Sequence, residues 1–207
     1  MAMSRQDSRL RYRAVARLHA ENIDQGFLPI LGQDFLALLY QAIDESPDSA
    51  LILAEEEGQV CGFIAGALDL KPVYRGLLRR WPALFLSLAP SLLIPTRLWR
   101  IIEIVRYSRK AGKGEAVESL PAAELLSVAV APSCRGRGHA EALYIELARF
   151  FIERDQEAFK IVVGSELEHA HRFYRRMGAE PRAEIAVHGG TPSTAYVQQC
   201  ADIHVSR

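Results

Sequence analysis

The segment 135–140, with the sequence RGRGHA, has residue types and spacing suited to binding an anion. It follows the strand-like run 125–130 and precedes an apolar periodic stretch typical of a helix. Amides at a helix N-terminus have no partner within the helix and carry partial positive charge, and glycine lets a phosphate approach them closely. The segment therefore predicts a site for a pyrophosphate-bearing ligand. The spacing of a P-loop and the GxGxxG spacing of a dinucleotide fold are both absent.

Two stretches carry a resemblance to a known family. The first resembles the acyl-CoA-binding signature of the GNAT acetyltransferases, Arg/Gln-x-x-Gly-x-Gly/Ala, which Arg135, Gly138 and Ala140 satisfy in register. The second, 170–179 (AHRFYRRMGA), resembles the A-x-x-hydrophobic-Tyr-x-x-x-Gly-Phe segment of that family's fourth helix. The order and separation of the two stretches also fit the family.

The resemblance covers roughly residues 50–68 and 122–200. Leu167 stands where the family often has an asparagine, which puts the cofactor contacts of that asparagine in doubt. Ala179 replaces the usual phenylalanine after the helix-ending glycine, a change that we interpret as one of packing.

The resemblance implies acetyl-CoA as cosubstrate. No metal is expected, because the cysteines lack metal-ligand spacing and His169 and His171, two residues apart, cannot share a helix face. Amides from Gly136 to Ala140 would take the pyrophosphate, and the backbone of Val128 and Val130 would pair with the pantetheine arm like an added strand. The residues expected to bind the cofactor are Val128, Ala129, Val130, Arg135, Gly136, Arg137, Gly138, His139 and Ala140.

Acetyl transfer to an amine requires removal of a proton, because a free alkyl amine has a pKa near 10 and is mostly protonated at neutral pH. Glu124 lies eleven residues before Arg135, where GNAT histone acetyltransferases carry their catalytic glutamate. A partly apolar cleft would raise the pKa of such a carboxyl group toward working pH. The alternative is that Glu124 is a solvated residue at a strand start. Ser127, Glu166 and Glu21 are weaker candidates.

The departing CoA sulfur needs a proton donor, and Tyr174 resembles the family's general acid. A tyrosine with an ordinary pKa near 10 is protonated and able to donate, although a tyrosine on an amphipathic helix is more often a core residue. Cys134 adjoins residues 135–140, here called the glycine segment. Direct attack by a bound amine, however, needs no protein nucleophile. The catalytic candidates are therefore Tyr174 and Glu124.

The elements that would position these residues follow from periodicity. Helices are predicted over 10–23, 33–43, from 138 to about 154, and over 168–177, and strands over 50–54, 59–68, 122–130 and 159–164, with a hairpin over 183–200. This order predicts a mixed α/β (α+β) fold. By the resemblance it is the GNAT acyl-CoA N-acyltransferase fold, a mixed and mostly antiparallel sheet flanked by helices. We expect a single domain over 1–207, with a helical insertion between strands 3 and 4.

The insertion, 71–113, carries ten basic residues against one acidic residue, although the whole chain has no net charge. It also contains an apolar cluster around Trp81, Phe85 and Trp99, which must be buried somewhere. We expect it to pack on its own domain, to shape a pocket for an anionic acceptor, or to contact a membrane surface or a second subunit, as in a homodimer. Nucleic acid is not an expected partner, because aromatic residues do not alternate regularly with the basic ones.

Composition limits the protein class. Hydrophobic residues make up 49% and charged residues 24% of the 207, the mixture of an ordinary globular domain. The three cysteines lack metal-ligand spacing, which argues against a zinc site, and the charged N-terminus lacks the apolar core of a signal peptide. The apolar run over 81–94 is interrupted and does not predict a membrane span. These features favour a cytoplasmic protein.

Together these features predict an N-acetyltransferase that moves an acetyl group from acetyl-CoA to a primary amine, on a small molecule, by direct attack in a ternary complex. One alternative is a non-catalytic acyl-CoA-binding module. The other is an acetyltransferase that acts on a protein N-terminus or lysine.

Overall fold

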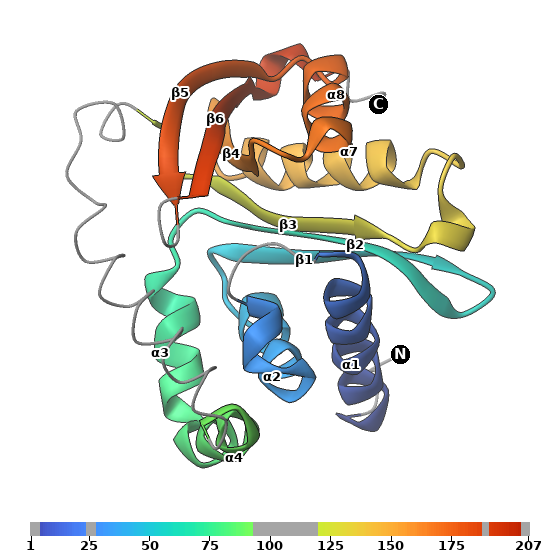
Figure 1. Cartoon of the computed structure of the whole chain (residues 1–207), viewed down its shortest axis with the longest axis vertical. Helices are drawn as coiled ribbons and strands as arrows, with labels where there is room; N and C mark the ends of the chain where they lie inside the picture. The colour runs from blue at the N-terminus through green and yellow to red at the C-terminus, as the bar shows by residue number, and fades with distance from the viewer. Residues whose placement is uncertain (1–4, 24–27, 93–119, 188–190, 204–207) are drawn as a thin grey trace.

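The computed structural model describes residues 5–23, 28–92, 120–187 and 191–203, and it contains a six-stranded sheet of order β1-β2-β3-β4-β6-β5 (Figure 1). All neighbouring strands are antiparallel except β3 and β4. The elements are α1 (Arg5–Asn22), η1 (Leu28–Leu31), α2 (Gln33–Asp44), β1 (Ser49–Glu56), β2 (Gln59–Ala67), α3 (Lys71–Arg79), α4 (Trp81–Leu92), β3 (Glu124–Val130), η2 (Pro132–Cys134), α7 (His139–Ile152), β4 (Ala158–Gly164), α8 (Glu168–Arg176), β5 (Glu180–Val187), β6 (Thr191–Gln199) and η3 (Cys200–Asp202). The mixed, mostly antiparallel sheet flanked by helices is confirmed.

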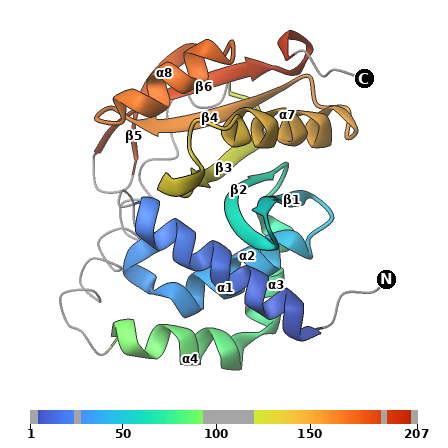
Figure 2. The same cartoon turned by 90° about the vertical axis from the view of Figure 1, so that its right-hand side faces the viewer.

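The sheet separates two layers of helices, with α1 to α4 on one face and α7 and α8 on the other (Figures 1 and 2). Each layer has its own core, one formed with α1, α2 and α3 and the other with α7 and α8. In α2, Leu36, Leu39, Tyr40 and Ile43 are buried at the spacing of one helix face. That spacing directs α2 onto the sheet.

Helix α7 packs closely on β2 because of a glycine. A Cβ atom added at Gly66 would lie 2.6 Å from Cδ1 of Leu147, so any side chain there would push the helix away. Leu147 and Phe151 are fully buried in this contact. The N-terminus of α7, which carries the glycine segment, is thereby held at a fixed height above the sheet.

The β1–β2 hairpin turns at Glu57 and Gly58, whose φ angles of 50° and 77° are both positive. Two-residue turns of this kind match the twist of the flanking strands, and glycine adopts such angles without strain. The turn fixes the register that places Glu56 opposite Gln59.

The described part of the basic insertion, up to residue 92, consists of α3 and α4. It lies between β2 and β3 of the described strands, one strand earlier than the count expected from sequence. Val73 and Leu77 of α3 are buried against the α1–α2 layer, whereas Leu78, Trp81 and Phe85 are exposed. Residues 93–113, including Trp99, fall outside the described residues. No helix of the described ranges is long and apolar enough to cross a membrane.

Candidate functional site

Strands β3 and β4 diverge soon after they meet. Their parallel pairing is confined to Glu124 with Lys160 and Leu125 with Ile161, and beyond that point residues 127–130 pair with β2 alone. A strand edge without a partner presents free amide and carbonyl groups to whatever lies beside it. The described structure therefore has an open backbone edge along the second half of β3.

The register shows which groups face this edge. The Ala131 amide donates to the Cys61 carbonyl at 2.8 Å, and Ala129 pairs with Phe63 two residues earlier. Because hydrogen-bonding direction alternates along an antiparallel strand, the amides and carbonyls of Val128 and Val130 point away from β2. These are the two residues that the sequence predicted to pair with the pantetheine arm.

The glycine segment follows directly from this edge. Gly136 and Gly138 have φ angles of 75° and 80°, and a Cβ atom at either would meet nothing within 4 Å. The left-handed backbone conformation therefore favours glycine at both positions, and the space beside them is open. Helix α7 begins at His139, with Gly138 as its N-cap, so the amides of its first turn have no intrahelical partners.

Three basic side chains lie beside the glycines, and each has a protein partner. Arg135 donates through Nε to the Val130 carbonyl at 3.1 Å and through Nη2 to Oδ1 of Asn22 at 2.9 Å. Arg137 Nη1 lies 2.6 Å from Oε2 of Glu56, and His139 Nε2 lies 2.7 Å from its Oε1. The loop is thus tied both to α1 and to the β1–β2 hairpin.

Glu56 is a site residue that sequence reasoning missed. Its hydrogen bonds from His139 and then from Arg137 hold the pKa of its carboxyl group below the usual value. His139 is 83 positions away from Glu56 in the sequence, and no local sequence pattern indicates that the two are in contact.

One group of side chains could offer ligands to a metal. Atoms of Glu56, Cys61 and His139 lie within 4.8 Å of one another. Both carboxylate oxygens of Glu56 already accept hydrogen bonds, however, so the ion pairs alone explain the arrangement. The expectation that the chain uses no metal stays a prediction.

Glu124 is paired with a lysine. Its Oε2 lies 3.4 Å from Nζ of Lys160, the residue opposite it on β4, and that ammonium also donates to the Pro121 carbonyl at 3.1 Å. The sequence argument placed this carboxylate in a partly apolar cleft, and the structure gives it a cationic neighbour instead. Glu124 still stands where β3 and β4 begin to diverge.

Tyr174 lies among aromatic rings, with its ring centroid 5.3 Å from that of Phe173 and 6.0 Å from that of Tyr144. It is 5% exposed, and burial raises the pKa of its hydroxyl above the ordinary value. The hydroxyl is therefore protonated at neutral pH, and it makes no hydrogen bond to the described residues. It belongs to the same core as Leu125, the neighbour of Glu124.

The weaker base candidates lie in two different settings. Glu21 and Glu166 are exposed. Ser127 Oγ lies 3.0 Å from the Tyr40 hydroxyl, which in turn lies 2.6 Å from Nδ1 of His19. This buried chain of three polar groups, reaching from α1 to β3, could not be read from the sequence.

The buried His19 gives the protein a dependence of stability on pH. Burial lowers the pKa of His19 from 6.5 to about 4. Between these two pH values the imidazole of the unfolded chain binds a proton, whereas that of the folded chain stays neutral. The free energy of unfolding should fall as the pH decreases through this window, by up to about 3 kcal/mol from this residue. Chemical denaturation at pH 7 and pH 5 checks this: His19→Gln should flatten the dependence, and the exposed His169→Gln should not. An equal slope in all three proteins would contradict the assignment.

Comparison with known proteins gives a family match. A model described as the acetyltransferase (GNAT) family matches residues 18–179. Among curated proteins, none matches the chain. Several solved structures share the fold at low identity.

An aminoglycoside 6'-N-acetyltransferase complexed with coenzyme A is 11% identical, with a TM-score of 0.58, and the match covers 100% of this chain and 97% of that one. The ribosomal-protein-S18-alanine N-acetyltransferase from Escherichia coli is 10% identical, with a TM-score of 0.54 and coverage of 97% and 92%. An N-acetyltransferase from Staphylococcus aureus is 11% identical, with a TM-score of 0.56 and coverage of 93% and 94%.

Proposed function

Since the chain belongs to the GNAT family of acetyltransferases, we propose that it transfers the acetyl group of acetyl-CoA to a primary amine on a small molecule. The observation that carries the proposal is the open edge of β3, which leads directly into the glycine segment. The backbone of Val128 and Val130 would pair with the pantetheine amides, as an added strand does. The first-turn amides of α7 would take the pyrophosphate.

The neighbouring basic side chains support this placement. Arg137 and His139 share one carboxylate, Glu56, and stand beside the open glycines. An arriving pyrophosphate would compete with Glu56 for them, and charge-assisted hydrogen bonds to phosphate are strong. Arg135 would act mainly by holding the Val130 carbonyl and thereby the end of β3.

Two side chains would transfer protons in the proposed reaction. The amine nitrogen attacks the thioester carbonyl carbon, and its proton passes to Glu124 directly or through water. The tetrahedral intermediate then collapses, the carbon–sulfur bond breaks, and Tyr174 donates its hydroxyl proton to the thiolate. Lys160 keeps the Glu124 carboxylate in place at the point where the strands diverge.

Two other functions use the same cofactor site. One solved structure of this fold acts on a protein alanine, according to its name, so a protein N-terminus or lysine is an alternative acceptor. A non-catalytic acyl-CoA-binding module is the other. Release of free CoA thiol, measured with a panel of small amines and of peptides, separates the three. Release with small amines alone supports the proposal, and no release with any acceptor contradicts it.

Glu124→Gln tests the base. We expect kcat/KM to fall by about tenfold at pH 7 and by less at pH 9, because more of the amine is already neutral there. The matched control is Glu184→Gln, which removes an exposed carboxylate on β5. A loss that is the same at both pH values would assign Glu124 a structural role.

Three further expectations remain proposals. A single domain over 1–207 is supported by the two cores, which share one sheet. A cytoplasmic location is supported by Cys61, Cys134 and Cys200, which are all free thiols. Contact of the insertion with a membrane surface or a second subunit is supported by the exposed Trp81 and Phe85.

A further inference from the structure

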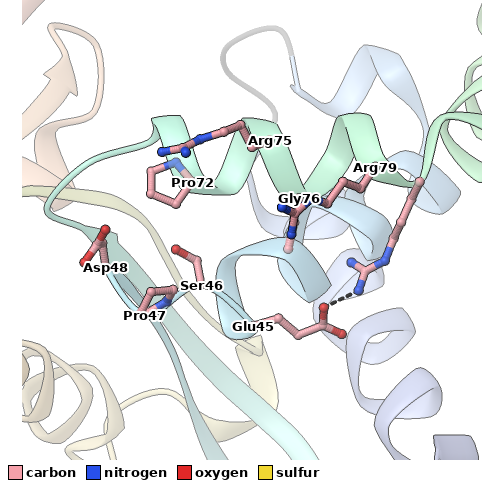
Figure 3. A pocket seen from close by; sticks show the side chains of 10 residues that line it. Glu45, Ser46, Pro47, Asp48, Pro72, Arg75, Gly76 and Arg79 are labelled. Atoms are coloured by element: carbon pink, nitrogen blue, oxygen red, sulfur yellow. Dashed lines mark hydrogen bonds and ion pairs between the residues drawn. The ribbon is translucent and has the colours of Figure 1, made fainter.

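A pocket of about 470 Å³ lies where α2 ends and β1 begins, and it is covered by α3 (Figure 3). Ligand pockets for small molecules commonly have volumes of this order. Arg75 and Arg79 come from α3, and Ser46 and Asp48 come from the opposite wall (Figure 3). The pocket belongs to the layer of α1 to α4 and is not part of the glycine segment.

The side chains that line the pocket include more arginines than carboxylates. Arg80 forms an ion pair with Glu45. Within the described part of the chain, Arg75 and Arg79 form no ion pair, and Asp48 supplies the only other carboxylate of the lining. Three guanidinium groups thus face two carboxylates, which favours a guest with negative charge.

Two buried polar atoms on lining residues have no hydrogen-bond partner among the residues that the structure describes. They are the hydroxyl oxygen of Ser46, a residue only 8% exposed, and Nη1 of Arg80. Buried polar groups in folded proteins are nearly always paired, and an unmet charged donor is especially costly. Both atoms are covered in this structure, so an oxyanion in the pocket would accept from them once the side chains of Ser46 and Arg80 turn toward it, whereas an apolar guest would leave both unmet.

The pocket also lies at the end of the sheet that carries Glu124, the proposed base for the acceptor amine. Ser49 pairs with Ala67, and Ala67 pairs with Glu124, so the pocket adjoins the start of β3. Burial, and after it the charge of Glu124, raises the pKa of Tyr74 of α3, which agrees with this placement. The glycine segment begins beyond Val130, about 20 Å away along the strand.

We propose that this pocket binds the phosphate group of a phosphorylated amine acceptor. The proposal rests on the acetyl-transfer function, because it names the class of substrate for that same site. A phosphate has enough oxygens to accept hydrogen bonds from Nη1 of Arg80 and from the Ser46 hydroxyl as well as from Arg75 and Arg79. Guanidinium groups bind phosphate well. CoA would leave this pocket free, since its own pyrophosphate is assigned to the other end of β3.

The first arm of the test measures binding without catalysis. Inorganic pyrophosphate is titrated calorimetrically into protein saturated with CoA, so that the glycine segment is already occupied. We expect one site, weakened about tenfold or more in Arg75→Gln/Arg79→Gln and also weakened in Ser46→Ala. Arg149→Gln, which removes an exposed arginine of α7, is the control. Absence of a site, or equal weakening in the control, would overturn the proposal.

The second arm compares acceptors that differ by one phosphate, glucosamine and glucosamine 6-phosphate. We expect the phosphorylated amine to have a KM at least about tenfold lower, and the double arginine variant to remove this difference with little change in kcat. Equal KM values with CoA release from both amines would overturn the phosphate proposal and leave the acetyltransferase proposal standing. If no amine of the panel releases CoA, the function fails, and the calorimetric arm alone decides on the pocket. Arginine-dependent binding of anionic phospholipid vesicles without binding of pyrophosphate would assign these residues to a membrane and overturn the proposal.

Discussion

Gly138→Asp is expected to abolish binding of acetyl-CoA, with a loss of affinity of at least about a hundredfold. The φ angle of Gly138 is 80°, and the space where its side chain would stand is open and adjoins the first-turn amides of α7. An aspartate there would put a carboxylate where the pyrophosphate must lie, so bulk and like charge would act together. Calorimetric titration with CoA measures the loss.

Two variants separate the causes of this loss. Gly138→Asn has similar bulk without the charge and tolerates the left-handed conformation, so we expect an intermediate affinity. Gly58→Asp replaces another glycine with positive φ and open surroundings, at the β1–β2 turn, and should retain CoA binding. If Gly138→Asp binds CoA as well as Gly58→Asp does, the pyrophosphate site lies elsewhere.

Tyr174→Phe is expected to lower kcat by one to two orders of magnitude while CoA affinity changes little. The hydroxyl is buried, protonated and without a hydrogen bond to the described residues, so its removal leaves no partner unmet in the free protein. The departing thiolate, in contrast, would lose its proton donor. Steady-state kinetics together with CoA titration separates the two effects.

The control for Tyr174 is its aromatic neighbour. Tyr144→Phe removes a hydroxyl that donates to Gln198 at 3.0 Å, so it should cost about 1 kcal/mol of stability and leave kcat unchanged. Unchanged turnover in Tyr174→Phe would make Tyr174 a packing residue. A loss of similar size in both variants would point to the shared core instead of a proton transfer.

The elements that bind the cofactor could be predicted from sequence because their signals are local. The helical spacing of Leu143, Leu147 and Phe151 and the two glycines before it indicate a helix with an exposed N-terminus. The structure contains that helix, beginning at His139. The strand before it was likewise visible as an apolar run.

The open edge of β3 could not be predicted in the same way. Whether Val128 pairs with β4 depends on how two strands separated by α7 are arranged, and no residue of β3 encodes that divergence. The partners of Glu56 and His19 are equally distant in sequence. The resemblance to a family supplied the expectation about Val128, and the register explains why its amide and carbonyl are available.

The lysine beside Glu124 shows a different limit. Sequence spacing placed Glu124 correctly on β3, but it gave no information about the facing strand, which puts Lys160 opposite it. A carboxylate paired with an ammonium is held in position, whereas one in apolar surroundings is made more basic. The kinetic comparison at two pH values is therefore the appropriate test of its role.

A crystal structure of the protein with bound CoA is the sharpest check on the proposed cofactor site. We expect pantetheine amides within hydrogen-bonding distance of the Val128 and Val130 backbone, pyrophosphate oxygens on the amides of Gly136 to Ala140, and the sulfur near the Tyr174 hydroxyl. We also expect Glu56 to release Arg137 or His139 to the phosphates. CoA bound away from the β3 edge, or with its pyrophosphate off the glycine segment, would show that the cofactor site is elsewhere.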